Sequence, residues 1–168
     1  MALSIDFSFV RSRKVIALAE YWRMKCNGGT WPTRGDLAPT DLKELLPNIV
    51  LSEVTRSPLQ VYYRLVGTRV AEMSRLDFTG RWLHDMSPAS VDPGIWHKGY
   101  QMLVESGQPV FGRTGIPIAE GSEIMLEEEF GLFPLELGVS DRFQCVAVED
   151  YGDAQHIDPE LLRAMQPR

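Results

Sequence analysis

The chain has 168 residues, 44% of them hydrophobic and 24% charged, a balance typical of one globular domain. Its 17 basic and 23 acidic side chains give a formal charge of -6, which repels nucleic-acid phosphates, so we expect no nucleic-acid partner. The two cysteines, Cys26 and Cys145, lie far apart without metal-ligand spacing, so the sequence indicates neither a zinc site nor a disulfide framework.

The N-terminal residues do not have the pattern of a targeting or membrane signal. Asp6, Arg11 and Arg13 interrupt the first apolar patch before the core of a signal peptide develops. No window approaches the ~20 apolar residues that span a bilayer. We therefore expect a soluble cytoplasmic protein without a membrane partner.

An amphipathic helix is the first predicted element, from about residue 9 to Cys26. Asn27-Gly28-Gly29 ends it, because glycine accepts the left-handed backbone that closes a helix. Its wide apolar face must pack on this domain or on a second copy, so residues 1–29 are also a candidate dimerisation element. The apolar residues recur mostly at three- and four-residue steps: Val10, Val15, Ile16, Leu18, Ala19, Tyr21 and Trp22.

A short helix is predicted over residues 42–46. Asp41, with Glu44 three residues later, can cap its start, and Pro47 stops it. This helix leads directly into the first strand.

A β-hairpin follows. Residues 49–55 and 59–66 are rich in β-branched and aromatic side chains, and Ser57-Pro58 between them is typical of a turn. Alternate residues of a strand point to opposite faces, which separates the second strand into two sets. We assign the more apolar set to the side covered by helices: Leu59, Val61, Tyr63 and Leu65.

The remaining chain predicts a helical crossover, three strands and a short terminal helix. The helices follow apolar residues at helical spacing, and the strands are extended runs separated by glycines. The predicted elements are a short helix over 69–73, a long helix over 91–106 that ends at Gly107, strands over 109–114, 124–137 and 142–150, and a helix that starts at Asp158-Pro159. We therefore expect the N-terminal helix over 1–29, a domain over 30–152 and a tail over 153–168.

Four short motifs, together with this order of elements, resemble the PAS sensor fold. The similarity is to a bacterial PAS-like family of mostly uncharacterised stand-alone proteins. It implies an α+β domain with a five-stranded antiparallel sheet, helices over one face, and a pocket that holds a small molecule or is filled by side chains. The motifs are Trp31-Pro32-Thr33-Arg34, Leu45-Leu46-Pro47, Tyr63-Arg64-Leu65-Val66-Gly67-Thr68 and Thr79-Gly80-Arg81.

The resemblance implies a regulatory or signalling module that is not an enzyme. PAS domains commonly sense ligands and dimerise, often through a helix that precedes the sheet. We therefore expect a homodimer through the N-terminal helix, contact with a separate signalling protein, and a small ligand if the pocket is open. Two alternatives stay open: an enzyme that processes a small molecule in the same cavity, and a structural interaction domain with a filled core.

No catalytic or phosphate-binding motif supports the enzyme alternative. An enzyme predicts at least two titratable groups that converge in the pocket, whereas a sensor can work with one or none. The predicted pocket set is instead mostly apolar and aromatic, and these side chains either line a ligand site or fill the core. The set comprises Tyr63, Leu65, Trp96, Tyr100, Leu103 and Phe111.

The sequence requires no cofactor and predicts no metal site. His97 lies on the long crossover helix, where haem-binding relatives of the PAS fold carry their axial ligand, but one histidine does not define a haem site. Flavin photochemistry needs a cysteine on the crossover helices, and Cys26 and Cys145 both lie elsewhere.

Two charged groups in predicted strands have structural interpretations. Arg64 lies among apolar neighbours and needs a partner, for which Glu53 on the adjacent strand is a candidate. In the run Glu127-Glu128-Glu129, the middle residue points opposite to the other two, and we expect a solvated strand.

Overall fold

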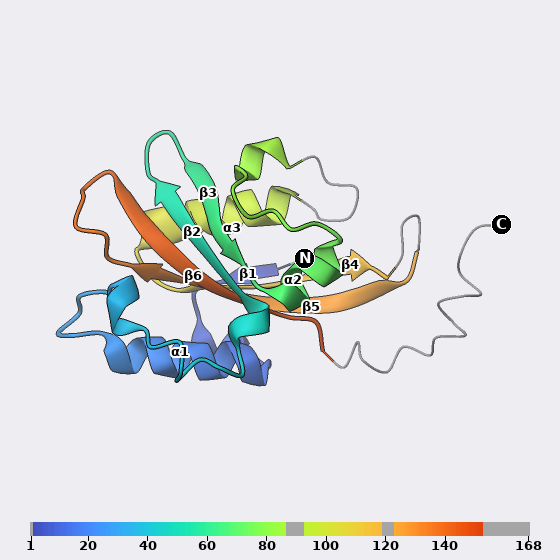
Figure 1. Cartoon of the computed structure of the whole chain (residues 1–168), viewed down its shortest axis with the longest axis horizontal. Helices are drawn as coiled ribbons and strands as arrows, with labels where there is room; N and C mark the ends of the chain where they lie inside the picture. Colours follow the sequence, from blue (N-terminus) through green and yellow to red (C-terminus); the bar gives the residue numbers. More distant parts are fainter. Residues whose placement is uncertain (1, 87–92, 119–122, 153–168) are drawn as a thin grey trace.

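A six-stranded antiparallel sheet in the order β1-β4-β5-β6-β2-β3 forms the centre of the protein (Figure 1). The computed structural model describes residues 2–86, 93–118 and 123–152. The strands are β1 (Ala2–Ser4), β2 (Ile49–Thr55), β3 (Gln60–Val66), β4 (Val110–Pro117), β5 (Met125–Leu135) and β6 (Arg142–Asp150). The helices are α1 (Arg13–Lys25), α2 (Thr68–Ser74) and α3 (Pro93–Ser106), with short 3-10 helices η1 (Phe7–Phe9), η2 (Arg34–Asp36), η3 (Leu46–Asn48) and η4 (Leu83–Asp85).

The expected five strands are all present, and β1 adds a sixth that the sequence analysis did not predict. This strand pairs with β4, with Ala2 opposite Arg113 and Ser4 opposite Phe111. Three residues are too few to show an alternating pattern, which is why the strand was missed. Residues 2–25 thus contribute both an edge strand and a helix to the packing of this sheet.

Helices cover both faces of the sheet, so the expectation of helices over one face is wrong. α3 lies over one face, and α1 lies against the other (Figure 1). The first layer buries Ile95 and Leu103 of α3, and the second buries Leu18 and Trp22 of α1. The indole of Trp22 also donates a hydrogen bond of 2.8 Å to the carbonyl of Pro134 in β5.

Helix α1 begins at Arg13, later than predicted, because residues 7–9 form the separate turn η1. The hydroxyl of Ser12 caps the helix by accepting a hydrogen bond of 3.1 Å from the amide of Val15. Four residues at helical spacing are buried against the sheet: Val15, Leu18, Ala19 and Trp22. The apolar side of α1 is therefore occupied by its own domain.

The predicted helix over residues 42–46 is wrong. Residues 39–45 form hydrogen-bonded turns, and a short 3-10 helix, η3, follows and contains Pro47. The Asp41 carboxylate does not cap a helix here, because it accepts a hydrogen bond of 2.9 Å from the Tyr21 hydroxyl.

The predicted hairpin is confirmed, but an irregularity changes its second half. Leu51 lies opposite Leu65, whereas the next residue, Ser52, lies opposite Tyr63. Arg64 is therefore an extra residue, and a bulge of this kind reverses the side-chain alternation that follows it. Val61 and Tyr63 face α3 as predicted, but Leu65 turns to the opposite face and is 43% exposed.

The crossover helix and the last three strands follow the prediction closely. α3 ends at Gly107, whose φ of +64° is the left-handed conformation that closes a helix. β6 has the predicted bounds, and β4 and β5 differ by a few residues at their ends. The predicted terminal helix from Asp158 lies outside the described residues.

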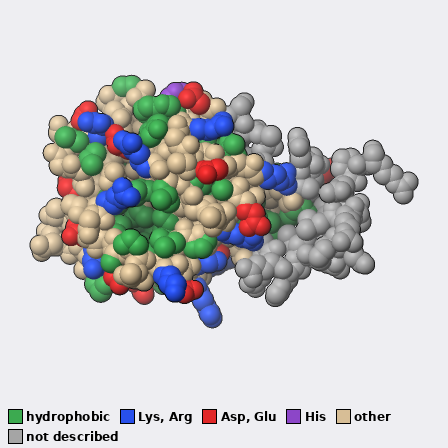
Figure 2. All heavy atoms as spheres, in the orientation of Figure 1, with side chains coloured by type: hydrophobic (Ala, Val, Ile, Leu, Met, Phe, Trp, Pro, Cys, Tyr) green, Lys and Arg blue, Asp and Glu red, His purple; other side chains and the backbone are tan. Residues whose placement is uncertain are grey.

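Charged side chains of both signs are spread over the face seen in Figure 2, and hydrophobic side chains gather near its middle. Elsewhere in the fold, the Glu53 carboxylate joins two arginines, since it lies 2.8 Å from Arg64 and 3.0 Å from Arg142. The predicted pairing of Arg64 with Glu53 is confirmed. Within the described residues, no helix is long and apolar enough to cross a membrane.

Candidate functional site

Four of the six predicted pocket residues lie together between the sheet and α3. Tyr63, Trp96, Tyr100 and Leu103 are all buried in the same core cluster. The hydroxyl of Tyr100 lies 3.1 Å from that of Ser52 on β2. The indole of Trp96 packs on a phenylalanine ring of β5, with ring centroids 4.2 Å apart.

The other two, Leu65 and Phe111, lie on the opposite face of the sheet. The bulge in β3 turns Leu65 outward, as described above. Phe111 follows Val110, which faces α3, so the alternation of β4 directs its ring toward α1. There it packs edge-on against Phe7 and Phe133, with centroid separations of 5.8 and 5.9 Å. These two residues are therefore not part of a pocket under α3.

His97 is exposed, although its neighbours Ile95 and Trp96 on α3 are buried. The imidazole faces a surface groove of about 230 Å³ that His84 and Met86 also line. It does not lie in the buried layer that holds Trp96. Within the described part of the chain, no cluster of three or more histidine, cysteine, aspartate or glutamate residues could hold a metal ion.

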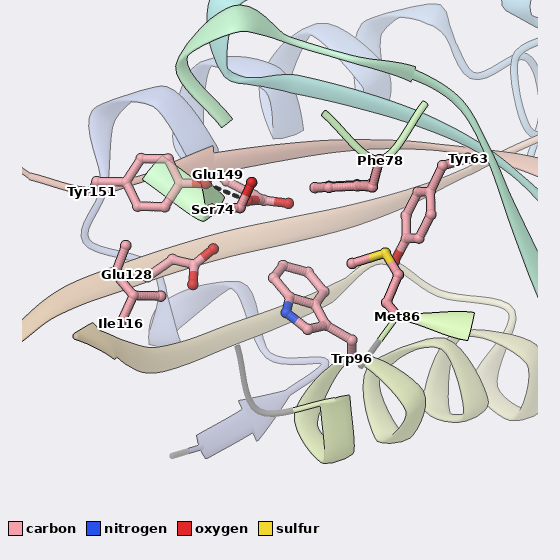
Figure 3. Close-up of a pocket in the computed structure, with 9 residues that line it drawn as sticks. All are labelled: Tyr63, Ser74, Phe78, Met86, Trp96, Ile116, Glu128, Glu149 and Tyr151. Carbon is pink, nitrogen blue, oxygen red and sulfur yellow. Dashed lines mark hydrogen bonds between the residues drawn. The ribbon is translucent and has the colours of Figure 1, made fainter. Parts of the chain in front are cut away.

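The most unusual feature of the buried layer is a pair of glutamates beside a tyrosine, which was not predicted from the sequence. Glu128 of β5 is 1% exposed, Glu149 of β6 is 7% exposed, and Tyr151 just beyond β6 is 4% exposed. Their side chains line a cavity of about 30 Å³ together with residues from α2, α3 and the hairpin (Figure 3). The lining residues are Tyr63, Ser74, Phe78, Met86, Trp96, Ile116, Glu128, Glu149 and Tyr151.

The expectation of a solvated strand at Glu127-Glu128-Glu129 is wrong, although the predicted alternation holds. Glu127 is exposed, but Glu128 is buried under α3 and Glu129, at 7% exposure, is buried on the α1 side. β5 is a central strand, and from Glu128 onward both of its faces are covered, so residues there are enclosed whatever their polarity. Nothing in a run of three glutamates distinguishes this setting from an exposed edge strand.

Electrostatics in the cavity favour a shared proton. Burial raises the pKa of Glu128 well above its usual range, and the neighbouring Glu149 raises it further. Burial also raises the pKa of Glu149 to about 7, against hydrogen bonds from Tyr151 and Glu128 that lower it. The Tyr151 hydroxyl donates to Glu149 (Figure 3). The cavity lining includes no cation, so one carboxyl group must keep its proton for the two to hydrogen-bond.

A second acidic pair lies on the same two strands but faces α1. Glu129 pairs directly with Asp150 in the ladder between β5 and β6, one position from Glu128 and Glu149. One oxygen of Glu129 accepts hydrogen bonds of 2.8 and 2.7 Å from the amides of Arg11 and Ser12. These contacts tie the start of α1 to the sheet.

Two cations also bind this second acidic pair. The other oxygen of Glu129 lies 2.7 Å from the guanidinium of Arg113. Asp150 accepts hydrogen bonds of 2.7 Å from the Ser12 hydroxyl and 2.9 Å from the ammonium group of Lys14. Two adjacent residues on each strand thus reach two different sites, one in the cavity and one at α1.

Known proteins with a PAS fold are similar to this chain. A family model described as a PAS domain matches residues 10–91, from just before α1 to just beyond η4. The matched residues, just under half of the chain, are similar to a PAS domain. The predicted resemblance is confirmed, and the PAS fold indicates a sensory or signalling module. No curated protein matches the chain.

Two solved structures resemble this PAS domain at low sequence identity. An RNA-binding light-oxygen-voltage receptor is 13% identical with a TM-score of 0.43, and the match covers 74% of this chain and 36% of that one. A fungal LOV-domain photoreceptor is 11% identical with a TM-score of 0.44, and the match covers 84% of this chain and 95% of that one. The present chain thus spans about a third of the length of the first receptor.

Proposed function

We propose that this PAS domain is a regulatory module in which the state of the cavity under α3 changes how α1 is held against the sheet. The observation that carries the proposal is the pair of adjacent acidic sites on β5 and β6. Glu128 and Glu149 line the cavity, while Glu129 and Asp150 bind the start of α1. A change in α1 would then alter contact with a partner protein or a second copy.

The physical basis is that both sites share the same backbone. Glu128 and Glu129 are consecutive, so a shift of β5 that relieves one side chain displaces the other. The hydrogen bonds to the amides of Arg11 and Ser12 have lengths of 2.8 and 2.7 Å and depend on the position of a single carboxylate. A displacement of that carboxylate by less than 1 Å weakens them, because hydrogen bonds lose strength steeply with distance and angle.

The size of the cavity limits the ligand. A volume of about 30 Å³ suits one water molecule, whereas sites for small organic ligands occupy roughly 300–1,000 Å³. A larger ligand would have to displace lining side chains such as Met86 and Trp96. Native mass spectrometry of the purified protein tests for a retained ligand, and the absence of any added mass would favour the filled-core alternative.

The transmission between the two sites is tested by a matched pair of variants. Tyr151→Phe removes the hydroxyl that donates to Glu149, and Tyr63→Phe removes another hydroxyl from the cavity but on β3. We expect Tyr151→Phe alone to lower the hydrogen-exchange protection of the Arg11 and Ser12 amides. Equal protection in both variants would contradict transmission through β5 and β6.

Dimerisation remains part of the proposal, but it needs a surface other than the buried side of α1. Met24 on the outer side of α1 is 69% exposed, and Leu65 on β3 is 43% exposed. If α1 forms the dimer contact, Met24→Glu lowers the mass measured by light scattering and Leu65→Glu does not. The opposite result would place the contact on the sheet, and a monomeric wild-type protein would leave only a separate partner.

One observation favours the enzyme alternative. Glu128, Glu149 and Tyr151 converge in the cavity, and such convergence of titratable groups is what that alternative predicts. The cavity leaves no room for a substrate unless its lining moves. Incubation with a metabolite extract, followed by mass spectrometry, tests this: turnover that disappears in Glu149→Gln would support an enzyme.

A further inference from the structure

We propose that Glu128 and Glu149 form a proton-responsive switch, in which loss of the proton shared by their carboxyl groups opens the cavity and loosens the start of α1. The inference deepens the proposed function by naming the proton as an input. It relies on that function only for the last step, the transmission to α1.

The pairing of β5 with β6 directs the two carboxyl groups into the same cavity. Glu149 lies opposite Phe130 in the ladder of β5 and β6, two residues from Glu128, and both side chains point to the same face. They both line a cavity of about 30 Å³, where the Tyr151 hydroxyl donates a hydrogen bond to Glu149 (Figure 3). Two carboxylates that line the same small, mostly apolar cavity repel each other strongly.

One proton on the pair removes this repulsion in the closed state. With one proton on the pair, Glu128 donates to Glu149, and the hydroxyl of Tyr151 is a second donor to the same carboxylate. The site then holds one negative charge with two hydrogen bonds. Loss of the shared proton removes one donor and adds a second charge at the same time.

The groups around the pair cannot compensate for that second charge. Among the described residues, neutral side chains dominate this site. Arg69, the cation that acts on the Tyr151 hydroxyl, is already paired with Glu72 at 2.8 Å. The titratable and charged groups that face the pair or its hydrogen-bond partner are Tyr151 and Cys145 from β6 and its end, Tyr63 from β3, Tyr100 from α3 and Arg69 from α2.

Burial raises the pKa values of the phenols and the thiol, so none of them supplies a charge of either sign near neutral pH. For the same reason, burial raises the pKa of both glutamates, which brings proton loss toward the neutral and alkaline range. The remaining way to relieve the repulsion is to admit water. Water enters when a lining side chain such as Tyr151 moves outward.

The opposite side of the strands links this opening to α1. Asp150 lies between Glu149 and Tyr151, so outward movement of Tyr151 displaces the residue that holds Ser12 and Lys14. The Arg11 and Ser12 amides, bound by Glu129, report on the same junction.

Glu128→Gln tests the switch. Glutamine has nearly the same shape and can still donate a hydrogen bond to Glu149, but it cannot lose its proton. Glu127→Gln is the matched control, one residue away on the same strand and exposed. Denaturant unfolding from pH 6.5 to 8.5 measures stability, and hydrogen-exchange protection factors at Arg11 and Ser12 measure the transmission.

We expect the unfolding equilibrium constant of the wild type to rise with pH. The rise is up to about tenfold per pH unit for each proton that the folded state holds and that unfolding releases. Glu127→Gln should follow the wild type, and Glu128→Gln should show a markedly smaller rise. Protection at Arg11 and Ser12 should fall with pH in the wild type and stay level in Glu128→Gln.

Two results would overturn the switch: a wild-type pH slope in Glu128→Gln, or NMR titration of both carboxyl carbons near the ordinary value of 4.5. Either could occur while Tyr151→Phe still alters the α1 amides, and the proposed function would then stand without a proton input. A lost pH slope in Glu128→Gln with constant protection at Arg11 and Ser12 in the wild type would support opening of the cavity and overturn its transmission to α1.

Discussion

The two acidic pairs on β5 and β6 differ in their partners more than in their burial. Glu128 and Glu149 lie among phenols and apolar groups, whereas Glu129 and Asp150 have backbone amides, a hydroxyl and two cations. All of these carboxyl groups are at least largely enclosed. The comparison shows that the charge state of a buried carboxyl group depends on which donors reach it.

The pKa directions follow that difference. Burial raises the pKa of Glu149 and outweighs its hydrogen bonds, whereas at Asp150 the hydrogen bonds from Ser12 and Lys14 outweigh burial and lower the pKa. The hydrogen bonds at Asp150 therefore favour its carboxylate form, whereas burial in the cavity favours at least one protonated carboxyl group. One side is a fixed anchor, and the other can change its charge near neutral pH.

Removing the acidic contacts on the α1 side should lower the free energy of unfolding more than removing those on the cavity side. Glu129→Ala deletes the acceptor for two amides and for Arg113, whose side chain is only 19% exposed. We expect a loss of about 3 kcal/mol in the free energy of unfolding, because two backbone amides lose their acceptor and Arg113 loses its shortest ion pair. Urea denaturation measures this, and Glu127→Ala serves as control. A loss that does not exceed that of the control would mean that the α1 contacts contribute little.

A second pair of variants tests which face of the sheet is covered by α3. Leu103→Ala removes a fully buried side chain of α3 and should cost about 2–5 kcal/mol, whereas Leu65→Ala, at a position 43% exposed, should cost about 0.5 kcal/mol or less. Thermal unfolding of the two variants measures the difference. Similar losses would contradict the outward position of Leu65 that the bulge at Arg64 produces.

That bulge shows where sequence reasoning reached its limit. The composition of residues 49–66 was sufficient to predict a hairpin, and alternation placed Val61 and Tyr63 correctly. One extra residue then reversed the alternation, and no feature of Arg64 or its neighbours indicated it. The position of Phe111 failed for a related reason, since its face depends on the register of β4 against the whole sheet.

The acid pair was missed because its meaning comes from tertiary structure. Glu128 and Glu149 are 21 positions apart in the chain, and only the pairing of β5 with β6 brings them together. The sequence did predict that Glu128 points opposite to Glu127 and Glu129. It could not indicate that α1 and α3 enclose both faces of β5, because that depends on the packing of distant helices.

The two sides should respond to pH with opposite signs. The pKa of Glu149 is raised to about 7 in the folded chain, so the folded state keeps a proton that the unfolded state releases near 4.5, and stability falls as pH rises between these values. The pKa of Asp150 is lowered from 3.8, so its contribution is present above that value and is lost as pH falls through the folded pKa.

These signs predict maximal stability near pH 4–5, on the acid side of the usual range of about pH 5–8. Asp150→Asn removes the acid-side contribution and should reduce the loss of stability below pH 4, while the decline above pH 5 remains. Denaturant midpoints from pH 3 to 8 measure both limbs. A wild-type optimum near pH 7 would show that the cavity pair is fully ionised at little cost, and the contrast between the two acidic sites would then lose its physical basis.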